Sequence, residues 1–220
     1  MWEFIDKIVY INLDNRQDRR DIMKSFFEKG QIPEDKIVRF SAIKRNNGAL
    51  GCLESHAQIL RMAKEQGWKN VLILEDDLQW SNLESQYSEL EALTNRPWDV
   101  ILLCGWYQEY NFPRIFKSIN TGAYLVNGSY YDKFLENRNS AIKSMIAQLN
   151  SGILKILDKR SYAADVSWNS LMKQDNWFGL YPCICSQVDG YSDNTGRIVK
   201  ASQIVGIFDQ KIHDAVFKHA

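Results

Sequence analysis

Apolar runs that suit buried strands alternate with helical patterns over the first half of the chain, and this alternation constrains the fold most. Strands are expected at residues 7–13, 36–42, 70–75 and 98–105. Between them, apolar residues recur at helical spacing over 19–30, 53–67 and 83–93. Strands that alternate with helices form a mostly parallel sheet, because each crossover helix packs back against it. The sequence therefore predicts an α/β fold of the Rossmann type, with a mixed, mostly parallel sheet and helices on both faces.

The second half of the chain has a less regular pattern. A strand is expected at residues 122–128, and helices are expected at 130–149 and 165–174. A further strand is expected at 177–182, and the tail from 203 to 220 suits either a strand or a helix. The total of 220 residues suits a single domain over 1–220.

Charge and composition argue against several classes of partner. Lys+Arg and Asp+Glu balance at 27 each, so bulk charge gives no support for binding nucleic acid or a membrane surface. No apolar run reaches the roughly 18 residues that a membrane span needs. The first residues lack the apolar region of a signal peptide. We therefore expect a cytoplasmic protein with no membrane span and no nucleic-acid partner.

The four cysteines are Cys52, Cys104, Cys183 and Cys185. Only the last two are close in sequence, and their C-x-C spacing has no further Cys or His nearby. This spacing is a poor zinc signature, so we expect reduced thiols in a reducing compartment.

Three carboxylates, Glu75, Asp76 and Asp77, lie at the end of the third predicted strand. Ligands of open α/β sheets bind beyond the carboxyl ends of the strands. Alternate residues of an extended chain share a face, so Glu75 and Asp77 should point the same way. A hard cation such as Mg²⁺ or Mn²⁺ would remove their mutual repulsion. A solvated acidic turn before the next helix explains the cluster equally well.

Three arginines, Arg16, Arg19 and Arg20, follow the first predicted strand and lie near the start of a helix. Positive charge at a helix N-terminus is unfavourable because it opposes the helix dipole, so we expect a negative group nearby. The neighbouring aspartates could supply it by local pairing. The other explanation is a bound diphosphate, which suits both the Arg fork and the N–H groups of a first helical turn. No glycine-rich dinucleotide motif or P-loop is present, which argues against hydride transfer and P-loop phosphoryl transfer.

Three segments, VYINLDNRQDRR, GALGCLESHAQIL and VLILEDD, resemble glycosyltransferase family 25 in order and spacing. That family includes bacterial lipooligosaccharide galactosyltransferases and collagen hydroxylysine galactosyltransferases. The resemblance continues more weakly through TGAYLVNGSYYDKFL and SQVDGYSDN. It implies a GT-A-like fold, a divalent metal, and transfer of a hexose such as galactose or glucose from a UDP-sugar with inversion. The acceptor would be a hydroxyl on a glycan, a lipid-linked glycan or a protein, as in lipopolysaccharide biosynthesis.

The resemblance also implies roles for individual residues. Glu75 and Asp77 stand in the places of the metal-binding D-x-D motif, and Asp77 is the stronger candidate because Glu75 is one methylene longer than the Asp of the family. Candidate donor-binding residues are Asn12, Leu13, Arg16, Arg19, Ser55, His56 and Asp76. For His56, which shares a helical face with apolar residues, a role as a satisfied core residue is the commoner one. Residues 1–105 would form the nucleotide-sugar-binding half and residues 106–220 the acceptor-side half.

An inverting transfer needs a general base on the acceptor side. Asp165, just before an apolar-periodic run, is the best candidate, although Asp there is also a favoured N-cap residue. Asp189 and Asp193 are rival catalytic residues that could instead complete the metal shell or form an ordinary turn.

Three aromatic residues, Trp106, Tyr107 and Tyr110, follow the fourth predicted strand and could form either a sugar platform or ordinary loop packing. Two other functions stay open from the sequence. One is a nucleotidyltransferase or phosphohydrolase that uses residues 75–77 for two metals. The other is a relative that binds a glycan or nucleotide without turnover.

Overall fold

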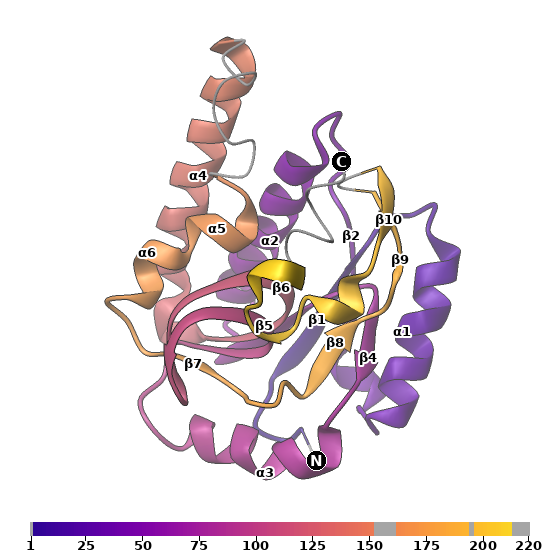
Figure 1. The fold of residues 1–220 in the computed structure, drawn as a ribbon, viewed down its shortest axis with the longest axis vertical. Coiled ribbons are helices and arrows are strands. Elements are labelled where there is room, and N and C mark those ends of the chain that lie inside the picture. Colours follow the sequence, from indigo (N-terminus) through magenta and orange to yellow (C-terminus); the bar gives the residue numbers. More distant parts are fainter. Residues whose placement is uncertain (1, 152–161, 194–195, 213–220) are drawn as a thin grey trace.

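A seven-stranded mixed sheet forms the centre of the computed structural model, which describes residues 2–151, 162–193 and 196–212 (Figure 1). Its strands are β1 (Lys7–Asn12), β2 (Ile37–Ser41), β3 (Asn70–Glu75), β5 (Val100–Asn111), β6 (Arg114–Asn127), β7 (Trp177–Gly179) and β11 (Gly206–Ile207). They lie in the order β11-β5-β7-β6-β3-β1-β2, and β5 also pairs with β6, so the sheet curls at this end. Strands from both halves of the chain therefore share one sheet, and the proposed division near residue 105 stays a prediction.

The sheet combines parallel pairs with one strand of opposite direction. β1 is parallel to β2 and β3, and β5 is parallel to β7 and β11. β6 is antiparallel to β3, β5 and β7. The predicted α/β fold with a mixed, mostly parallel sheet is confirmed.

Six helices and four short strands are added to this sheet in the described residues, besides short 3-10 turns and a helical stretch at residues 210–212. The helices are α1 (Gln17–Lys29), α2 (Gly48–Glu65), α3 (Leu83–Thr94), α4 (Tyr131–Ser151), α5 (Ala164–Ser167) and α6 (Asn169–Met172). β4 (Leu78–Trp80) pairs with β8 (Cys185–Gln187), and β9 (Gly190–Ser192) pairs with β10 (Arg197–Val199). None of the helices in the described ranges is both long and apolar enough to span a lipid bilayer.

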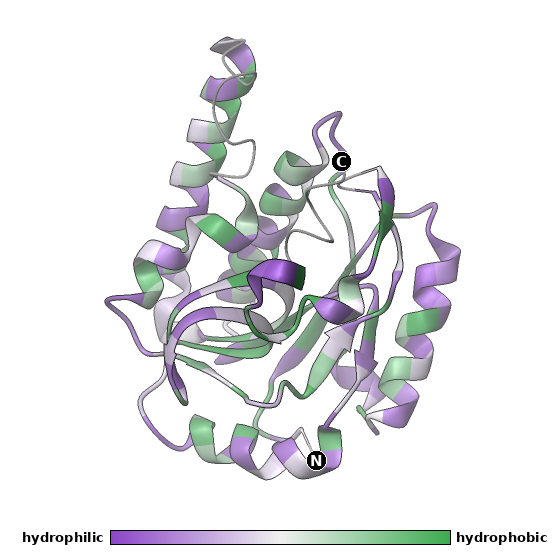
Figure 2. Ribbon diagram, viewed as in Figure 1, coloured by the Kyte–Doolittle hydropathy of each residue, from purple (hydrophilic) through white to green (hydrophobic). Residues whose placement is uncertain are grey.

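The two faces of the sheet carry separate cores because successive residues of a strand point to opposite faces. On β3, Leu72 and Leu74 pack with α1 and α3, whereas Val71 and Ile73 pack with α2 and α4. Figure 2 shows the hydrophobic colour along the central strands and an alternation of colours along the outer helices. Strands apolar on both faces are what a sheet covered on both sides requires.

Two strands are longer than the sequence predicted. β5 continues to Asn111 and β6 begins at Arg114, so residues 106–121 form a long hairpin instead of a loop. Conversely, the helix predicted over 165–174 is broken into α5 and α6. At the break, the fully buried Trp168 donates its indole N–H to the carbonyl of Ser118 at 3.0 Å. In the tail predicted as a strand or a helix, Gly206–Ile207 forms β11, and residues 213–220 lie outside the described residues.

Helix α2 begins five residues before the predicted start, because the Asn47 side chain caps it by accepting from the backbone N–H of Leu50 at 2.9 Å. Gly51 lies inside the helix and lets the preceding loop approach it closely. A Cβ atom at Gly51 would lie 2.3 Å from the carbonyl oxygen of Ile43. Ser55, one turn later, accepts from the N–H of Ile43 at 2.9 Å and donates to the carbonyl of Gly51 at 2.7 Å.

We expect Gly51→Ala to lower the free energy of unfolding by about 1–3 kcal/mol, because a backbone carbonyl leaves no space for the added methyl group. Urea unfolding followed by circular dichroism measures this. Glu65→Ala, on the exposed end of the same helix, is the control and should stay within about 0.5 kcal/mol of the parent. Equal stability of the two variants would contradict the close contact.

Candidate functional site

The acidic cluster lies at the carboxyl edge of the sheet, where β3 ends beside β1. Glu75 is the last residue of β3, and Asp76 and Asp77 lead into β4. Register in the sheet places Glu75 opposite Ile11 of β1. The next residue of β1, Asn12, is buried and donates from Nδ2 to Asp76 at 2.7 Å. The polar ends of two neighbouring strands therefore meet, as expected for a ligand site of an α/β sheet.

Glu75 and Asp77 point toward a common place, as the alternation of side chains predicts. The amide nitrogen of Gln187, from β8, donates to Glu75 Oε2 at 2.7 Å and to Asp77 Oδ1 at 3.0 Å. The other oxygen of Glu75, Oε1, accepts from the hydroxyl of Thr121 on β6 at 2.5 Å. A single hydrogen-bond donor thus lies between the two carboxylates.

One buried guanidinium, that of Arg19, offsets part of the negative charge. Arg19 is 5% exposed, and its Nη1 lies 2.8 Å from Asp77 Oδ2. Its Nη2 donates to the backbone carbonyl of Tyr191 at 2.7 Å. Three adjacent carboxyl groups therefore face one buried arginine, which leaves an excess of negative charge at this edge.

Burial affects the two inner carboxyl groups differently. Burial raises the pKa of Asp76. The hydrogen bond from Asn12 and the charge of Arg19 act to lower this pKa, but burial outweighs them. Burial also acts to raise the pKa of Glu75, but His56, Thr121 and Arg19 together outweigh it, and the pKa of Glu75 is lowered. Glu75 is therefore held as an anion, and Asp76 is the group that resists ionisation.

The arginines after β1 are paired with protein groups, and the pair of Arg16 with Asp18 is the kind of contact that the local-pairing interpretation predicts. Arg19 instead pairs with the more distant Asp77. Arg16 donates to Asp18 through Nε at 2.9 Å and Nη2 at 2.7 Å, and it also pairs with Asp193. The hydrogen bonds from the Arg16 guanidinium lower the pKa of Asp18 to about 2. Arg20 and Arg39 both donate to the side-chain oxygen of Asn12, at 3.2 and 3.0 Å. The side chain of Asn12 therefore uses both its nitrogen and its oxygen in hydrogen bonds, and these bonds connect the end of β1 to Asp76, Arg20 and Arg39.

Two other candidate donor residues are used inside the protein. The carbonyl of Leu13, just after β1, accepts from the N–H of Arg16 at 2.9 Å in a tight turn. The hydroxyl of Ser55 is buried and bonded to Ile43 and Gly51. Their predicted contact with a donor stays a prediction.

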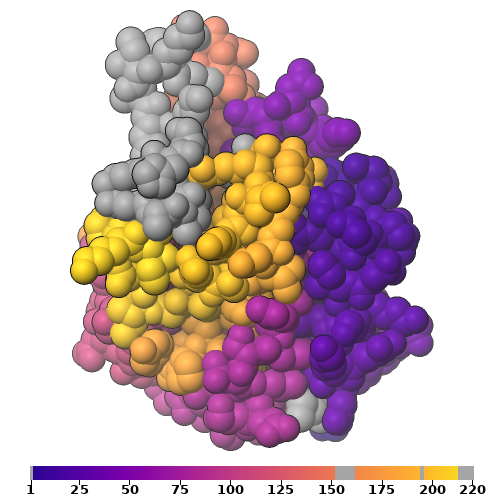
Figure 3. All heavy atoms as spheres, turned by 45° about the vertical axis from the view of Figure 1, so that its right-hand side comes forward, coloured from indigo at the N-terminus to yellow at the C-terminus, as the bar shows by residue number. Residues whose placement is uncertain are grey.

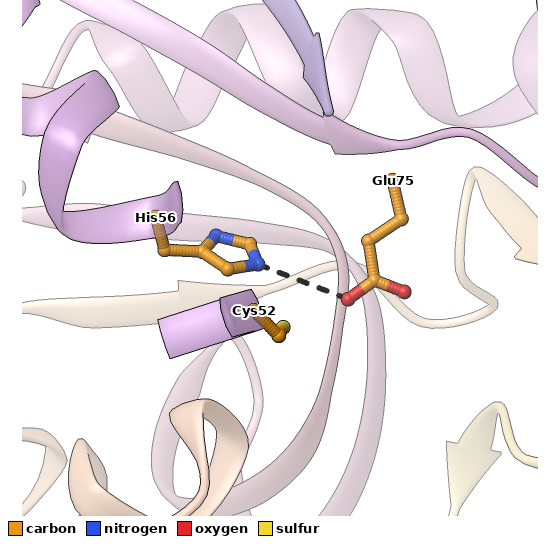
Figure 4. A group of neighbouring side chains, drawn as sticks. All are labelled: Cys52, His56 and Glu75. Atoms are coloured by element: carbon orange, nitrogen blue, oxygen red, sulfur yellow. Dashed lines mark ion pairs between the residues drawn. The ribbon is translucent and has the colours of Figure 1, made fainter. Parts of the chain in front are cut away.

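His56 lies in the core and also faces the acidic cluster (Figure 4). Its ring is fully buried, and Nδ1 is 2.7 Å from the hydroxyl of Tyr124. Its Nε2 lies 3.9 Å from Glu75 Oε1 and has no hydrogen-bond partner. Burial lowers the pKa of His56, which favours the neutral ring. The expected core position of His56 is confirmed, but one of its ring nitrogens is not satisfied. Its contact with a donor sugar stays a prediction.

The three candidate catalytic aspartates differ in position. Asp165 lies in the first turn of α5 and accepts from the N–H of Asn120 at 3.2 Å. Because Asn120 precedes Thr121, which contacts Glu75, Asp165 lies beside the acidic cluster. The N-cap residue of α5 is Ala163, so the interpretation of Asp165 as an N-cap is wrong.

The other two aspartates lie on the segment after β8. Asp193 is exposed and pairs with Arg16. Asp189 is also exposed, and its side chain accepts from the N–H of Ser202 at 2.9 Å, which lowers the pKa of Asp189. Asp193 therefore meets the predicted donor residues, whereas the carboxylate of Asp189 is turned toward Ser202.

Both interpretations of the aromatic residues after the fourth predicted strand, a sugar platform and ordinary loop packing, need correction. Trp106 and Tyr107 are fully buried within β5, where Tyr107 donates to the carbonyl of Leu180 at 3.0 Å. They lie in a strand instead of a loop, because the hairpin continues past Gly105. Tyr110 alone of the three is exposed, at 39%, and its ring packs near that of Phe112.

The segment from 187 to 193 covers this edge of the sheet. Gln187, Tyr191 and Asp193 contact Glu75, Asp77, Arg19 and Arg16. In Figure 3 the orange C-terminal part lies directly against the indigo N-terminal part. A surface hollow of about 410 Å³ lies elsewhere, between α2 and α4, and its lining includes Arg45, Arg61 and Asn139. Sequence reasoning missed Thr121 and Gln187, although both lie in segments that resemble family 25.

No model of a known protein family matches the chain, and no curated protein matches it either. The resemblance to family 25 therefore stays a prediction.

Solved structures with a similar fold include A197 from STIV, with 13% identity, a TM-score of 0.49, and coverage of 93% of this chain and 98% of that one. Another is a glycosyltransferase involved in the glycosylation of the major capsid of PBCV-1, with 11% identity, a TM-score of 0.48, and coverage of 79% and 80%. A third is a proposed glucose-1-phosphate thymidylyltransferase from Bacillus anthracis, with 13% identity, a TM-score of 0.42, and coverage of 83% and 70%. At these scores the similarity adds no argument about function.

We expect the Arg19–Asp77 pair to show a coupling energy of about 1–3 kcal/mol in a double-mutant cycle of Arg19→Ala and Asp77→Ala, because both side chains are largely buried. Urea unfolding of the four proteins measures it. The exposed Lys24–Glu28 pair on α1 is the matched control, and its coupling should be about 0.3–0.5 kcal/mol. If both cycles gave the same coupling energy, the buried Arg19–Asp77 pair would contribute no more to stability than an exposed ion pair.

Proposed function

We propose that this chain is a metal-dependent glycosyltransferase that moves a hexose from a UDP-sugar to a hydroxyl acceptor with inversion. One observation carries the proposal: Glu75 and Asp77 share a single hydrogen-bond donor at an edge of the sheet that keeps an excess of negative charge. Paired arginines lie beside that edge, on the first turn after β1. Carboxylates bind hard divalent cations and arginines bind phosphate groups, so a site that holds both suits a cation together with a diphosphate.

The residues present fit a hard divalent cation such as Mn²⁺ or Mg²⁺. The Gln187 amide nitrogen lies within 3.0 Å of oxygens from both carboxylates, so a small hydrogen-bond donor is already accommodated between them. Turning this side chain away would free both oxygens as ligands, with Glu75 and Asp77 holding the ion. When bound, the cation would neutralise charge on the leaving diphosphate.

Arg16 and Arg19 would bind the diphosphate. Arg16 already donates to the carboxylate oxygens of Asp18 and Asp193, so its guanidinium is placed to bind anionic oxygen. Asp193 is exposed, and exposed ion pairs contribute little stability, so a donor phosphate could replace it at low cost. Asn12, Leu13, Ser55, His56 and Asp76 would shape the remaining donor site around the ends of β1 and β3.

Asp165 is the general base of this proposal. It is half-buried beside the residues that contact Glu75, whereas Asp193 is paired with Arg16 and Asp189 is bonded to Ser202. The acceptor oxygen would attack the anomeric carbon while the bond to the diphosphate breaks, and Asp165 would take the hydroxyl proton. A glycan, a lipid-linked glycan or a protein could supply the hydroxyl.

A thermal-shift panel of nucleotides and nucleotide sugars, with and without Mn²⁺, tests the function. We expect UDP-sugars to raise the melting temperature only when Mn²⁺ is present, because the cation joins the carboxylates to the diphosphate. Asp77→Asn should weaken Mn²⁺-dependent UDP binding by about tenfold or more in calorimetry. Asp21→Asn, on the exposed face of α1, is the control and should bind normally.

Two outcomes of this panel would contradict the proposal. A shift with nucleoside triphosphates instead of UDP-sugars would indicate a nucleotidyltransferase. Undiminished Mn²⁺-dependent UDP binding by Asp77→Asn would remove Asp77 as a metal ligand.

Asp165→Asn should lower kcat by about 10²–10⁴ and leave the donor affinity unchanged, because the base acts only on the acceptor hydroxyl. Steady-state transfer to a panel of hydroxyl acceptors, together with calorimetry of UDP-sugar binding, separates the two effects. Asp189→Asn is the matched control and should retain kcat. Full activity in Asp165→Asn would assign the base elsewhere.

A further inference from the structure

We propose that Cys52, His56 and Glu75 form a binding site for zinc or a similar borderline divalent cation. This site shares Glu75 with the proposed function, but its other ligands are different, and it does not depend on glycosyl transfer. The sequence alone favours no such site, because Cys52 and His56 are only two ligands and Glu75 lies on a different predicted element.

The three side chains converge from two elements (Figure 4). Cys52 and His56 are four residues apart on α2, so they lie one turn apart on the same face of the helix. Glu75 reaches them from the end of β3. The Cys52 sulfur, one ring nitrogen of His56 and one oxygen of Glu75 all lie within 4.8 Å of one another.

The orientation of the His56 ring is the second, independent observation. Its Nδ1 is fixed by the hydroxyl of Tyr124 at 2.7 Å. Its Nε2 is fully buried, has no hydrogen-bond partner, and lies 3.9 Å from Glu75 Oε1. Buried polar atoms without a partner are rare in folded proteins. If Nδ1 carries the proton toward Tyr124, the lone pair of Nε2 faces the sulfur and the carboxylate, as a metal ligand requires.

The kind of ligand decides which cation fits. A thiolate, an imidazole and a carboxylate together suit Zn²⁺ or Co²⁺, whereas Mg²⁺ and Mn²⁺ prefer oxygen ligands only. Ligand atoms at about 2.0–2.3 Å from a tetrahedral zinc ion lie about 3.3–3.8 Å from one another, so the three atoms would have to move closer together by up to about 1.5 Å on binding. Cys52 and Glu75 are half-buried, so the cluster is partly exposed to solvent.

Cobalt titration of the full chain, kept reduced, tests this site. A thiolate-to-cobalt charge-transfer band in the near ultraviolet and strong visible bands should grow to one equivalent of Co²⁺, and Zn²⁺ should displace them. Cys52→Ser should abolish the charge-transfer band. Tyr124→Phe should weaken cobalt binding by about tenfold, because it removes the hydrogen bond that orients the ring. Circular dichroism of each variant confirms folding.

The control is Cys183→Ser, whose sulfur contacts Gly105 and Tyr107 instead, and it should keep the full spectrum. Asp77→Asn should also keep it, whereas Cys52→Ser should keep the Mn²⁺-dependent response to UDP-sugars, so failures of the two proposals are distinguishable. Absence of the band in the parent protein, its persistence in Cys52→Ser, or its loss in Cys104→Ser would overturn the site.

Discussion

The placement of three carboxyl groups against one buried guanidinium is the constraint on which the site depends. Glu75, Asp76 and Asp77 follow a strand buried on both faces, so they cannot all turn to bulk water. Arg19 compensates one charge, and burial keeps Asp76 reluctant to ionise. The remaining charge is held by neutral donors from Thr121 and Gln187. Partly buried carboxylates that lie close together repel one another and lower the stability of the fold, unless a positive group binds between them.

Residues far apart in the sequence build this environment. Thr121 comes from the antiparallel strand β6, beside β3, and Gln187 comes from β8, which pairs with β4. Arg19 reaches the same place from the start of α1 and is fixed by the carbonyl of Tyr191. The segment from 187 to 193 thereby covers the carboxyl edge of the sheet, where strands β1 and β3 from the N-terminal half end. Its contacts with Arg16 and Asp77 make this cover part of the site.

Much of the fold could be predicted because the parallel half of the sheet is locally encoded. β3 has the predicted limits, β1 ends one residue earlier than predicted, and β2 is one residue shorter than predicted at each end. The early start of α2 was missed although its cause is local, because the Asn47 side chain accepts from the N–H of Leu50 within the first turn. The other predictions failed where tertiary contacts outweighed local pattern. The curled hairpin draws Trp106 and Tyr107 into the core, and the buried Trp168 interrupts an amphipathic run. These two have no periodic signal, because each depends on a partner distant in sequence.

The sequence by itself determined the α/β sheet, the position of the acidic residues at a strand end, and the common direction of Glu75 and Asp77, since these follow from alternation along the chain. Only the tertiary structure decided what those residues meet. It paired Arg16 with Asp193, placed Asp165 beside Asn120, and turned His56 toward Glu75 with one ring nitrogen left without a partner. These contacts join segments up to 177 residues apart, and such separations leave no trace in local periodicity.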